Sequence, residues 1–171
     1  HGAISSMVGM EKNVLVMTGS GRAVVLDSRS GNELAQWASP TKFKVSKVAW
    51  LGDGRVLLGG SSIVMVDSTT GARLGKWIGH ATPVISLSSS EQYFCSAATG
   101  DRTVAVWSTR KKASVAHISL NHPVAVVSMA RVSSAAEERY QVVAVTLSGD
   151  IHVFKYSSGS GQAVEWARSD G

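Results

Sequence analysis

The 171-residue sequence has few of the features that mark membrane or secreted proteins. No apolar run approaches the roughly 18 residues that a membrane span needs, so we predict no transmembrane segment. A single cysteine, Cys95, excludes an internal disulfide and fits a reducing compartment. Because Cys95 lies in a short apolar run, we expect its thiol to be buried as a small hydrophobic group. The sequence has no Asn-x-Ser/Thr site and no signal-peptide pattern.

The sequence also lacks helical segments, since no stretch combines helical length with helical periodicity. Proline is scarce, at 3 residues, whereas the 17 glycines cluster at expected turns. Hydrophobic residues make up 44% of the chain, which is enough for a substantial core. Short apolar runs between glycine-rich or polar turns predict strands at 13–17, 55–58, 93–96 and 141–146. We therefore predict an all-β fold.

No constellation for nucleophilic, metal or acid/base catalysis is present. Gly19-Ser20-Gly21 follows a predicted strand but precedes another strand, so it predicts a hairpin and not a phosphate-binding helix start. His117, His122 and His152 are scattered without the i, i+4 pairing of a helical metal site. We predict no enzyme activity, no cofactor and no metal.

What is present is an internal repeat, most complete from Gly79 to Trp107. A Gly-His pair is followed by an apolar strand, a second strand ending near Ser96, a turn with Asp101, and a strand that ends at Trp107. This order is the signature of a WD-type β-propeller blade, a four-stranded antiparallel sheet.

The rest of the chain repeats the same pattern. Segment 26–31 recurs as segment 66–71, and the position of Trp107 is held elsewhere by Leu26, Val66 and Phe154. The spacings are 40, 41 and 47 residues, and the longest interval contains a polar insertion at 133–139 that we expect to be an exposed loop. Four blades are predicted, at about 1–38, 39–79, 80–120 and 121–167. Because WD rings more often have seven blades, we expect the chain to be part of a larger propeller.

The repeat from Gly79 to Trp107 resembles WD-repeat proteins, in which a His, a strand hydroxyl, a turn Asp and a Trp form a hydrogen-bonded tetrad. The resemblance assigns these roles to His80, Ser96, Asp101 and Trp107. A catalytic His-Asp pair is the competing interpretation, but no nucleophile stands at a matching position. The predicted role of the tetrad is structural.

The net charge of +5 permits contact with phosphate backbones. The positively charged residues gather in two groups. One group lies at the start of the second predicted blade, and the other lies in a turn of the third, where Arg102 also stands beside Asp101. We expect neither group to be interleaved with exposed aromatics of the kind that stack on single strands, and a solvated rim is the alternative interpretation. The candidate contacts with RNA or a partner are Lys42, Lys44, Lys47, Arg102, Arg110, Lys111 and Lys112.

Three segments, taken in their order along the chain, resemble one particular family of WD-repeat proteins. Segment 77–87 with its Gly-His-Ala-Thr-Pro-Val run, segment 92–98, and segment 149–154 resemble the WD repeat-containing protein 43 family, whose fungal members are the fifth U3 small nucleolar RNA-associated proteins. The resemblance implies a non-catalytic nucleolar scaffold of the small-subunit processome, in the subcomplex called UTP-A or t-UTP, supporting pre-18S rRNA processing. Implied partners are other WD-repeat subunits, the 5′ external transcribed spacer and the U3 snoRNP, by direct or indirect contact, with no membrane and no small-molecule substrate.

A different class of function also fits a propeller. A WD-repeat adaptor could bind a peptide motif, as a ubiquitin-ligase substrate receptor or a chromatin reader. Peptide binding with weak salt dependence would favour this alternative, because RNA contacts through Lys and Arg weaken steeply with salt.

Overall fold

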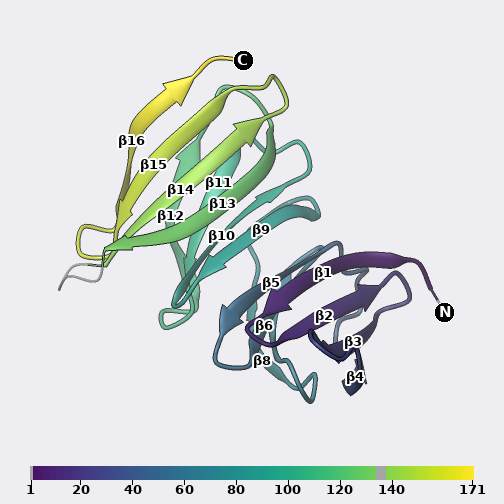
Figure 1. Cartoon of the computed structure of the whole chain (residues 1–171). Coiled ribbons are helices and arrows are strands. Elements are labelled where there is room, and N and C mark those ends of the chain that lie inside the picture. The colour runs from purple at the N-terminus through teal and green to yellow at the C-terminus, as the bar shows by residue number, and fades with distance from the viewer. Residues whose placement is uncertain (1, 134–137) are drawn as a thin grey trace. The chain divides into compact units, whose positions relative to one another are not determined.

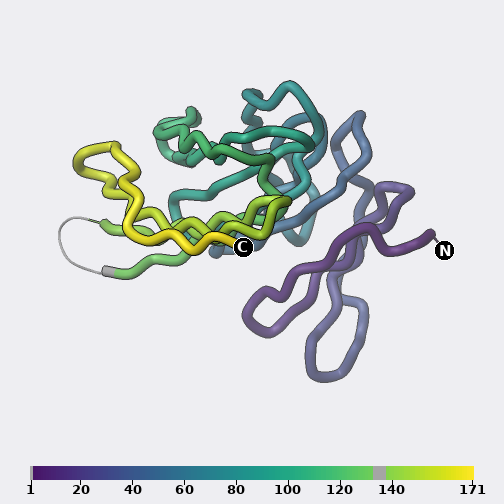
Figure 2. Tube along the Cα trace, turned by 90° about the horizontal axis from the view of Figure 1, so that it is seen from above, coloured from purple at the N-terminus to yellow at the C-terminus, as the bar shows by residue number. Residues whose placement is uncertain are grey.

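The computed structural model describes residues 2–133 and 138–171 and consists of four antiparallel sheets of four strands each. No helix occurs in these two described ranges, which confirms the all-β prediction. Every strand pairs with its neighbour in sequence, so each sheet is a meander (Figure 1). Figure 2 follows the same hairpins along the Cα trace. We call the sheets blades 1 to 4.

Two blades form the first of two compact units, residues 1–84. Blade 1 contains β1 (Ile4–Met10), β2 (Asn13–Thr18), β3 (Arg22–Asp27) and β4 (Glu33–Ala38). Blade 2 contains β5 (Lys47–Gly52), β6 (Arg55–Gly59), β7 (Ile63–Asp67) and β8 (Arg73–Trp77).

The other two blades form the second unit, residues 85–171. Blade 3 contains β9 (Val84–Ser90), β10 (Tyr93–Ala98), β11 (Thr103–Ser108) and β12 (Ala113–Ser119). Blade 4 contains β13 (Val124–Ser133), β14 (Arg139–Thr146), β15 (Ile151–Ser157) and β16 (Gln162–Ser169). Most of the insertion expected to be an exposed loop, 134–137, lies outside the described residues.

A β-bulge marks the same place in every blade. Between the third and fourth strands, the register shifts immediately before Leu26, Val66, Trp107 and Phe154. These are the four positions that the repeat period aligned. The bulge places an extra residue in the outer strand and bends it, so the four outer strands share one irregularity at the same point of the repeat.

Segments 26–31 and 66–71, which repeat one another in the sequence, form equivalent turns in blades 1 and 2. Asp67 Oδ1 accepts hydrogen bonds from the backbone and hydroxyl of Thr70, at 2.8 and 2.9 Å, and Asp27 makes the same contacts with Ser30, at 2.7 and 2.8 Å. Gly31 and Gly71 then take φ values of +72° and +71°, which glycine adopts without steric cost. Each turn is thus specified locally by its Asp and Gly.

The core of the first unit lies between blades 1 and 2, where Leu15, Met17 and Val25 pack against Val56 and Val66. Trp37 closes this core: it is only 8% exposed, and its indole Nε1 donates to Ser68 O at 2.9 Å. The backbone N–H of Val48 also donates to Ser6 Oγ across the two blades, at 3.1 Å.

The second unit repeats this arrangement with aromatic side chains. Tyr93 of blade 3 packs against Tyr140 and Tyr156 of blade 4, with ring centroids 4.9 and 5.4 Å apart. Cys95 in β10 is fully buried, as expected, and burial raises the pKa of its thiol to about 12. The thiol therefore stays protonated and packs as an apolar group.

Candidate interaction surface

Two residues of the expected tetrad are joined by a hydrogen bond in blade 3. Trp107 Nε1 donates to Ser96 Oγ at 2.7 Å, and both side chains are buried. Because a buried indole N–H needs an acceptor, this bond fixes β11 against β10. The parts expected of His80, in the segment before β9, and of Asp101, in the turn before β11, remain predictions.

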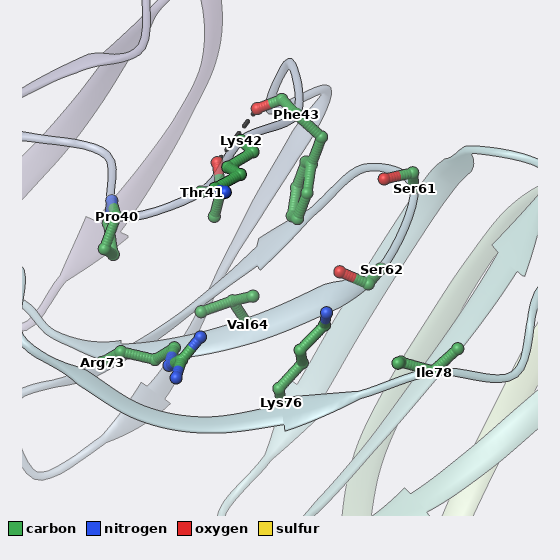
Figure 3. A pocket seen from close by; sticks show the side chains of 10 residues that line it. All are labelled: Pro40, Thr41, Lys42, Phe43, Ser61, Ser62, Val64, Arg73, Lys76 and Ile78. Carbon is green, nitrogen blue, oxygen red and sulfur yellow. Dashed lines mark hydrogen bonds between the residues drawn. The ribbon is translucent and has the colours of Figure 1, made fainter.

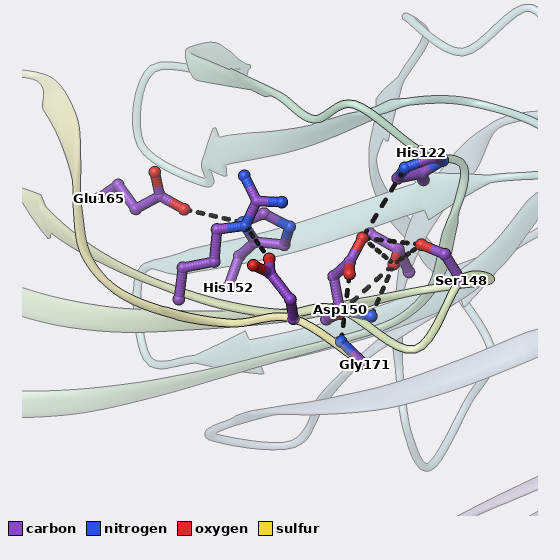
Figure 4. A network of polar contacts seen from close by, with 9 residues as sticks. His122, Ser148, Asp150, His152, Glu165 and Gly171 are labelled. Carbon is purple, nitrogen blue, oxygen red and sulfur yellow. Dashed lines mark hydrogen bonds and ion pairs between the residues drawn. The ribbon is translucent and has the colours of Figure 1, made fainter.

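Blade 4 has no such hydrogen bond, because Ala144 and Phe154 stand where blade 3 has Ser96 and Trp107. Its polar contacts centre instead on Asp150 (Figure 4). The carboxylate accepts from Ser148 Oγ at 2.7 Å and from the Gly171 backbone at 3.3 Å, and these bonds hold the pKa of Asp150 below its usual value. His122 Nε2 lies 4.0 Å from the same carboxylate.

Blade 4 also contains a buried histidine that the sequence did not single out as structural. His152 is 3% exposed, and its Nδ1 lies 2.7 Å from Glu165 Oε1 of the neighbouring strand, as Figure 4 shows. Its ring also stacks on Phe154. Asp150 and His152, two buried titratable side chains, are thus each engaged with a neighbour in the same blade, an arrangement that suits stabilisation.

Within the described ranges, no group of three or more His, Cys, Asp or Glu side chains is placed to hold a metal ion. In the same residues no helix is long and apolar enough to cross the lipid core. The exposed basic side chains remain as the candidates for recognition.

The candidate basic residues of blade 3 lie at opposite ends of β11. Arg102 is exposed immediately before the strand, whereas Arg110 to Lys112 occupy the turn after it. Lys112 takes a φ of +52° at the position that Gly31 and Gly71 hold in blades 1 and 2. A side chain in this left-handed region is strained, so the turn presents Lys112 at some cost in stability.

The candidate residues of blade 2 are divided by the fold. Lys42, Lys44 and Lys47 are all exposed, and Lys47 begins β5. Only Lys42 of the three lines a cleft of about 440 Å³, where it meets Arg73 and Lys76 from β8 (Figure 3). We call this the basic cleft; Ser61, Ser62, Pro40, Thr41, Phe43, Val64 and Ile78 complete its lining.

The loop that carries Lys42 is held at several points. Ser39 donates its backbone N–H to Gly21 O at 2.7 Å, and Thr41 Oγ1 donates to Phe43 O at 2.9 Å. At the far end, Ser46 donates its backbone N–H to Gly59 O at 2.8 Å. These contacts fix the loop before any ligand arrives, which lowers the ordering cost of binding.

Gly60 brings the two sides of the cleft together. A Cβ at this position would collide with the Phe43 ring and lie 2.7 Å from Lys44 O, closer than real Cβ contacts allow. The missing side chain therefore lets the loop of Lys42 pack directly over the β6–β7 turn that carries Ser61 and Ser62.

Arg73 and Lys76 are the functional candidates that sequence analysis missed. Both lie on the face of the sheet that carries Val66 and Val64, because they pair with those residues. The repeat held a signal for them: at the equivalent positions of blade 1, Leu26 and Val24 pair with Glu33 and Gln36. Alignment of the two copies would have shown two new positive charges in blade 2.

Comparison with known proteins supports the fold. No protein-family model matches the chain, and neither does a curated protein. A solved structure of U3-55K is 16% identical with a TM-score of 0.69, covering 96% of this chain and 51% of that one. The WD40 domain of Neurospora crassa Pan2 is 16% identical with a TM-score of 0.70, covering 88% and 48%. The computationally designed protein Ika4 is 20% identical with a TM-score of 0.70, covering 90% and 91%.

These similarities define the class of structure. The chain has the fold of WD40 β-propeller blades, which supports its prediction as a WD-repeat protein. At 16 to 20% identity they establish the fold alone, and the chain spans about half the length of the U3-55K and Pan2 chains. Because a fold by itself does not determine function, the expected absence of enzyme activity stays a prediction.

Proposed function

We propose that this chain is part of a non-catalytic scaffold subunit of the nucleolar small-subunit processome, in the U3 snoRNP-associated UTP-A or t-UTP subcomplex. In this role it supports pre-18S rRNA processing and early 90S pre-ribosome assembly. Its partners are other WD-repeat subunits and the 5′ external transcribed spacer with the U3 snoRNP. The resemblance of the repeats to the WD repeat-containing protein 43 family supports this proposal, as does the U3-55K protein among its structural neighbours.

One observation carries the RNA part of the proposal: the blades present exposed positive charge on their loops and turns. Lys42, Lys44, Lys47, Arg102 and the 110–112 turn are exposed, whereas the buried carboxylate Asp150 is engaged within its blade. Lys and Arg contacts with phosphates give an affinity that falls with salt and carries little sequence preference. A scaffold on nascent pre-rRNA needs this kind of contact.

Affinity purification of the tagged protein from cells tests the proposal. We expect 5′ external transcribed spacer RNA, U3 RNA and other WD-repeat nucleolar subunits to co-purify. Recovery of cullin-type ligase components or histones without pre-ribosomal RNA would overturn the proposal and favour a peptide-binding adaptor.

A second experiment tests the turn of blade 3. Replacing Arg110, Lys111 and Lys112 with Glu should reduce RNA crosslinking, and unchanged crosslinking would show that this turn does not contact RNA.

A further inference from the structure

We infer that the basic cleft of blade 2 binds the phosphodiester backbone of single-stranded RNA through Lys42, Arg73 and Lys76. The inference rests on RNA being the partner in the proposed function, and it adds a site made of residues from two separate segments. Figure 3 shows Lys76 extending from β8 toward the turn that carries Ser62, with Arg73 pointing into the same cleft.

The charge of the cleft is uncompensated. Three cationic side chains line it, and no Asp or Glu is among its lining residues. Within the described residues none of the three makes an ion pair. Cations that are not already paired attract an anion without first breaking an internal salt bridge, and an arginine can bind two phosphate oxygens at once.

The shape of the cleft favours a polymer. Its volume of about 440 Å³ exceeds what one phosphate group fills, and its cations come from two elements, the β4–β5 loop and β8. Apolar surface borders the charges, since Phe43 and Pro40 line the cleft and Ile78 is 72% exposed. Phosphates can therefore lie along the cations while a sugar or base rests on this apolar border.

The neutral hydroxyls add to this chemistry. Ser61 and Ser62, in the β6–β7 turn, line the cleft opposite β8. A serine hydroxyl donates to a phosphate oxygen or accepts from a ribose 2′-OH. Lys44, on the same loop as Lys42, and Lys47, at the start of β5, extend the positive potential beyond the cleft.

Blade 1 supplies the design of the test, because its equivalent cleft of about 310 Å³ has Glu33 and Gln36 where blade 2 has Arg73 and Lys76. Replacing Arg73→Glu and Lys76→Gln gives blade 2 the side chains of blade 1. The matched control, Arg29→Glu with Lys12→Gln, changes the net charge equally at exposed turns of the same unit.

Binding of a labelled single-stranded RNA of about 12 nucleotides to the purified chain is measured by fluorescence anisotropy between about 50 and 200 mM salt. We expect the cleft variant to bind at least about ten-fold more weakly at low salt, and the slope of log K against log salt to fall in magnitude by about 1.4, as for two lost phosphate contacts. The control should change affinity by less than about three-fold.

Equal weakening by both variants would overturn the inference, because it would show an effect of net charge alone. Unchanged binding by the cleft variant would overturn it as well, as would binding of a phosphopeptide in preference to RNA. These outcomes leave the processome proposal open to its own test, since co-purification of pre-rRNA depends on the whole assembly. Failure of co-purification with intact RNA binding in the cleft would reject the processome and keep the site.

Discussion

Blades 1 and 2 share one backbone plan but present different surfaces. Both have the Asp-capped turn, the glycine at positive φ and the bulge before Leu26 or Val66. Their clefts differ, because β4 carries Glu33 and Gln36 where β8 carries Arg73 and Lys76. Positions that fix the turn have kept their chemistry in both copies, whereas solvent-facing positions of the outer strand have diverged. Substitutions at solvent-facing positions of the outer strand can therefore change which ligand a blade binds without disturbing its fold.

We expect the largest loss of stability from a substitution at Trp37, which joins blades 1 and 2. Trp37 of β4 is buried, donates to Ser68 O, and packs over Gly71 in the turn before β8. Trp37→Ala should lower the free energy of unfolding by about 3–5 kcal/mol, the range for removing a buried tryptophan. Urea unfolding followed by circular dichroism measures this loss. A loss below about 1 kcal/mol would show that the turn of blade 2 does not depend on blade 1.

Two equivalent glycines sharpen the comparison. A Cβ at Gly71 would lie 2.7 Å from the Trp37 ring, whereas a Cβ at Gly31 would meet nothing within 4 Å. Both substitutions by Ala force a side chain into the left-handed region, at about 1–2 kcal/mol. Gly71→Ala should lose about 1–3 kcal/mol more through overpacking. Equal losses in urea unfolding would contradict the close packing of Trp37 on this turn.

We expect the smallest loss of stability from substitutions of the turn carboxylates, and the loss should be the same in blades 1 and 2. Hydrogen bonds from Ser30 lower the pKa of Asp27, and those from Thr70 lower the pKa of Asp67. A lowered folded-state pKa means that each carboxylate stabilises the fold above its unfolded pKa, and that this stabilisation disappears as the pH falls through the folded pKa.

Asn at either position keeps the accepting oxygen but removes the charge. Asp27→Asn and Asp67→Asn should each lower the urea midpoint slightly at pH 7, and this difference from the unsubstituted chain should shrink as the pH falls through the folded-state pKa. Urea midpoints at pH 7 and at a series of acidic pH values check this expectation. A much larger effect in one blade would show that the two turns are not equivalent.

Several features were predictable from the sequence because they are specified locally. The predicted strand 93–96 is part of β10, and the predicted strand 55–58 is part of β6, which follows the two-residue Asp53-Gly54 loop with both residues at positive φ. The repeat period placed Trp107 and Phe154 at the same point of their blades, where the bulges now lie. Side-chain alternation and turn chemistry depend on only a few neighbouring residues, so they can be predicted without a structure.

Of the three cations in the basic cleft, the sequence pointed to one. Lys42 was found because it lies in a dense group of lysines in the sequence, but Arg73 and Lys76 follow it by some 30 residues. In blade 4, His152 and Glu165 come from neighbouring strands and meet across the bulge before Phe154. Strand register, which places such residues together, is set by pairing along the whole strand.

The sequence by itself determined that this chain forms four antiparallel blades with glycine-rich turns between short strands, because strand periodicity and turn chemistry act locally. Only the tertiary structure decided which charges share a cleft. Gly60 lets the loop of Lys42 pack over the β6–β7 turn, and the register of β8 with β7 puts Arg73 and Lys76 on the facing side. Both conditions depend on packing between segments far apart in the chain, and no local pattern contains them.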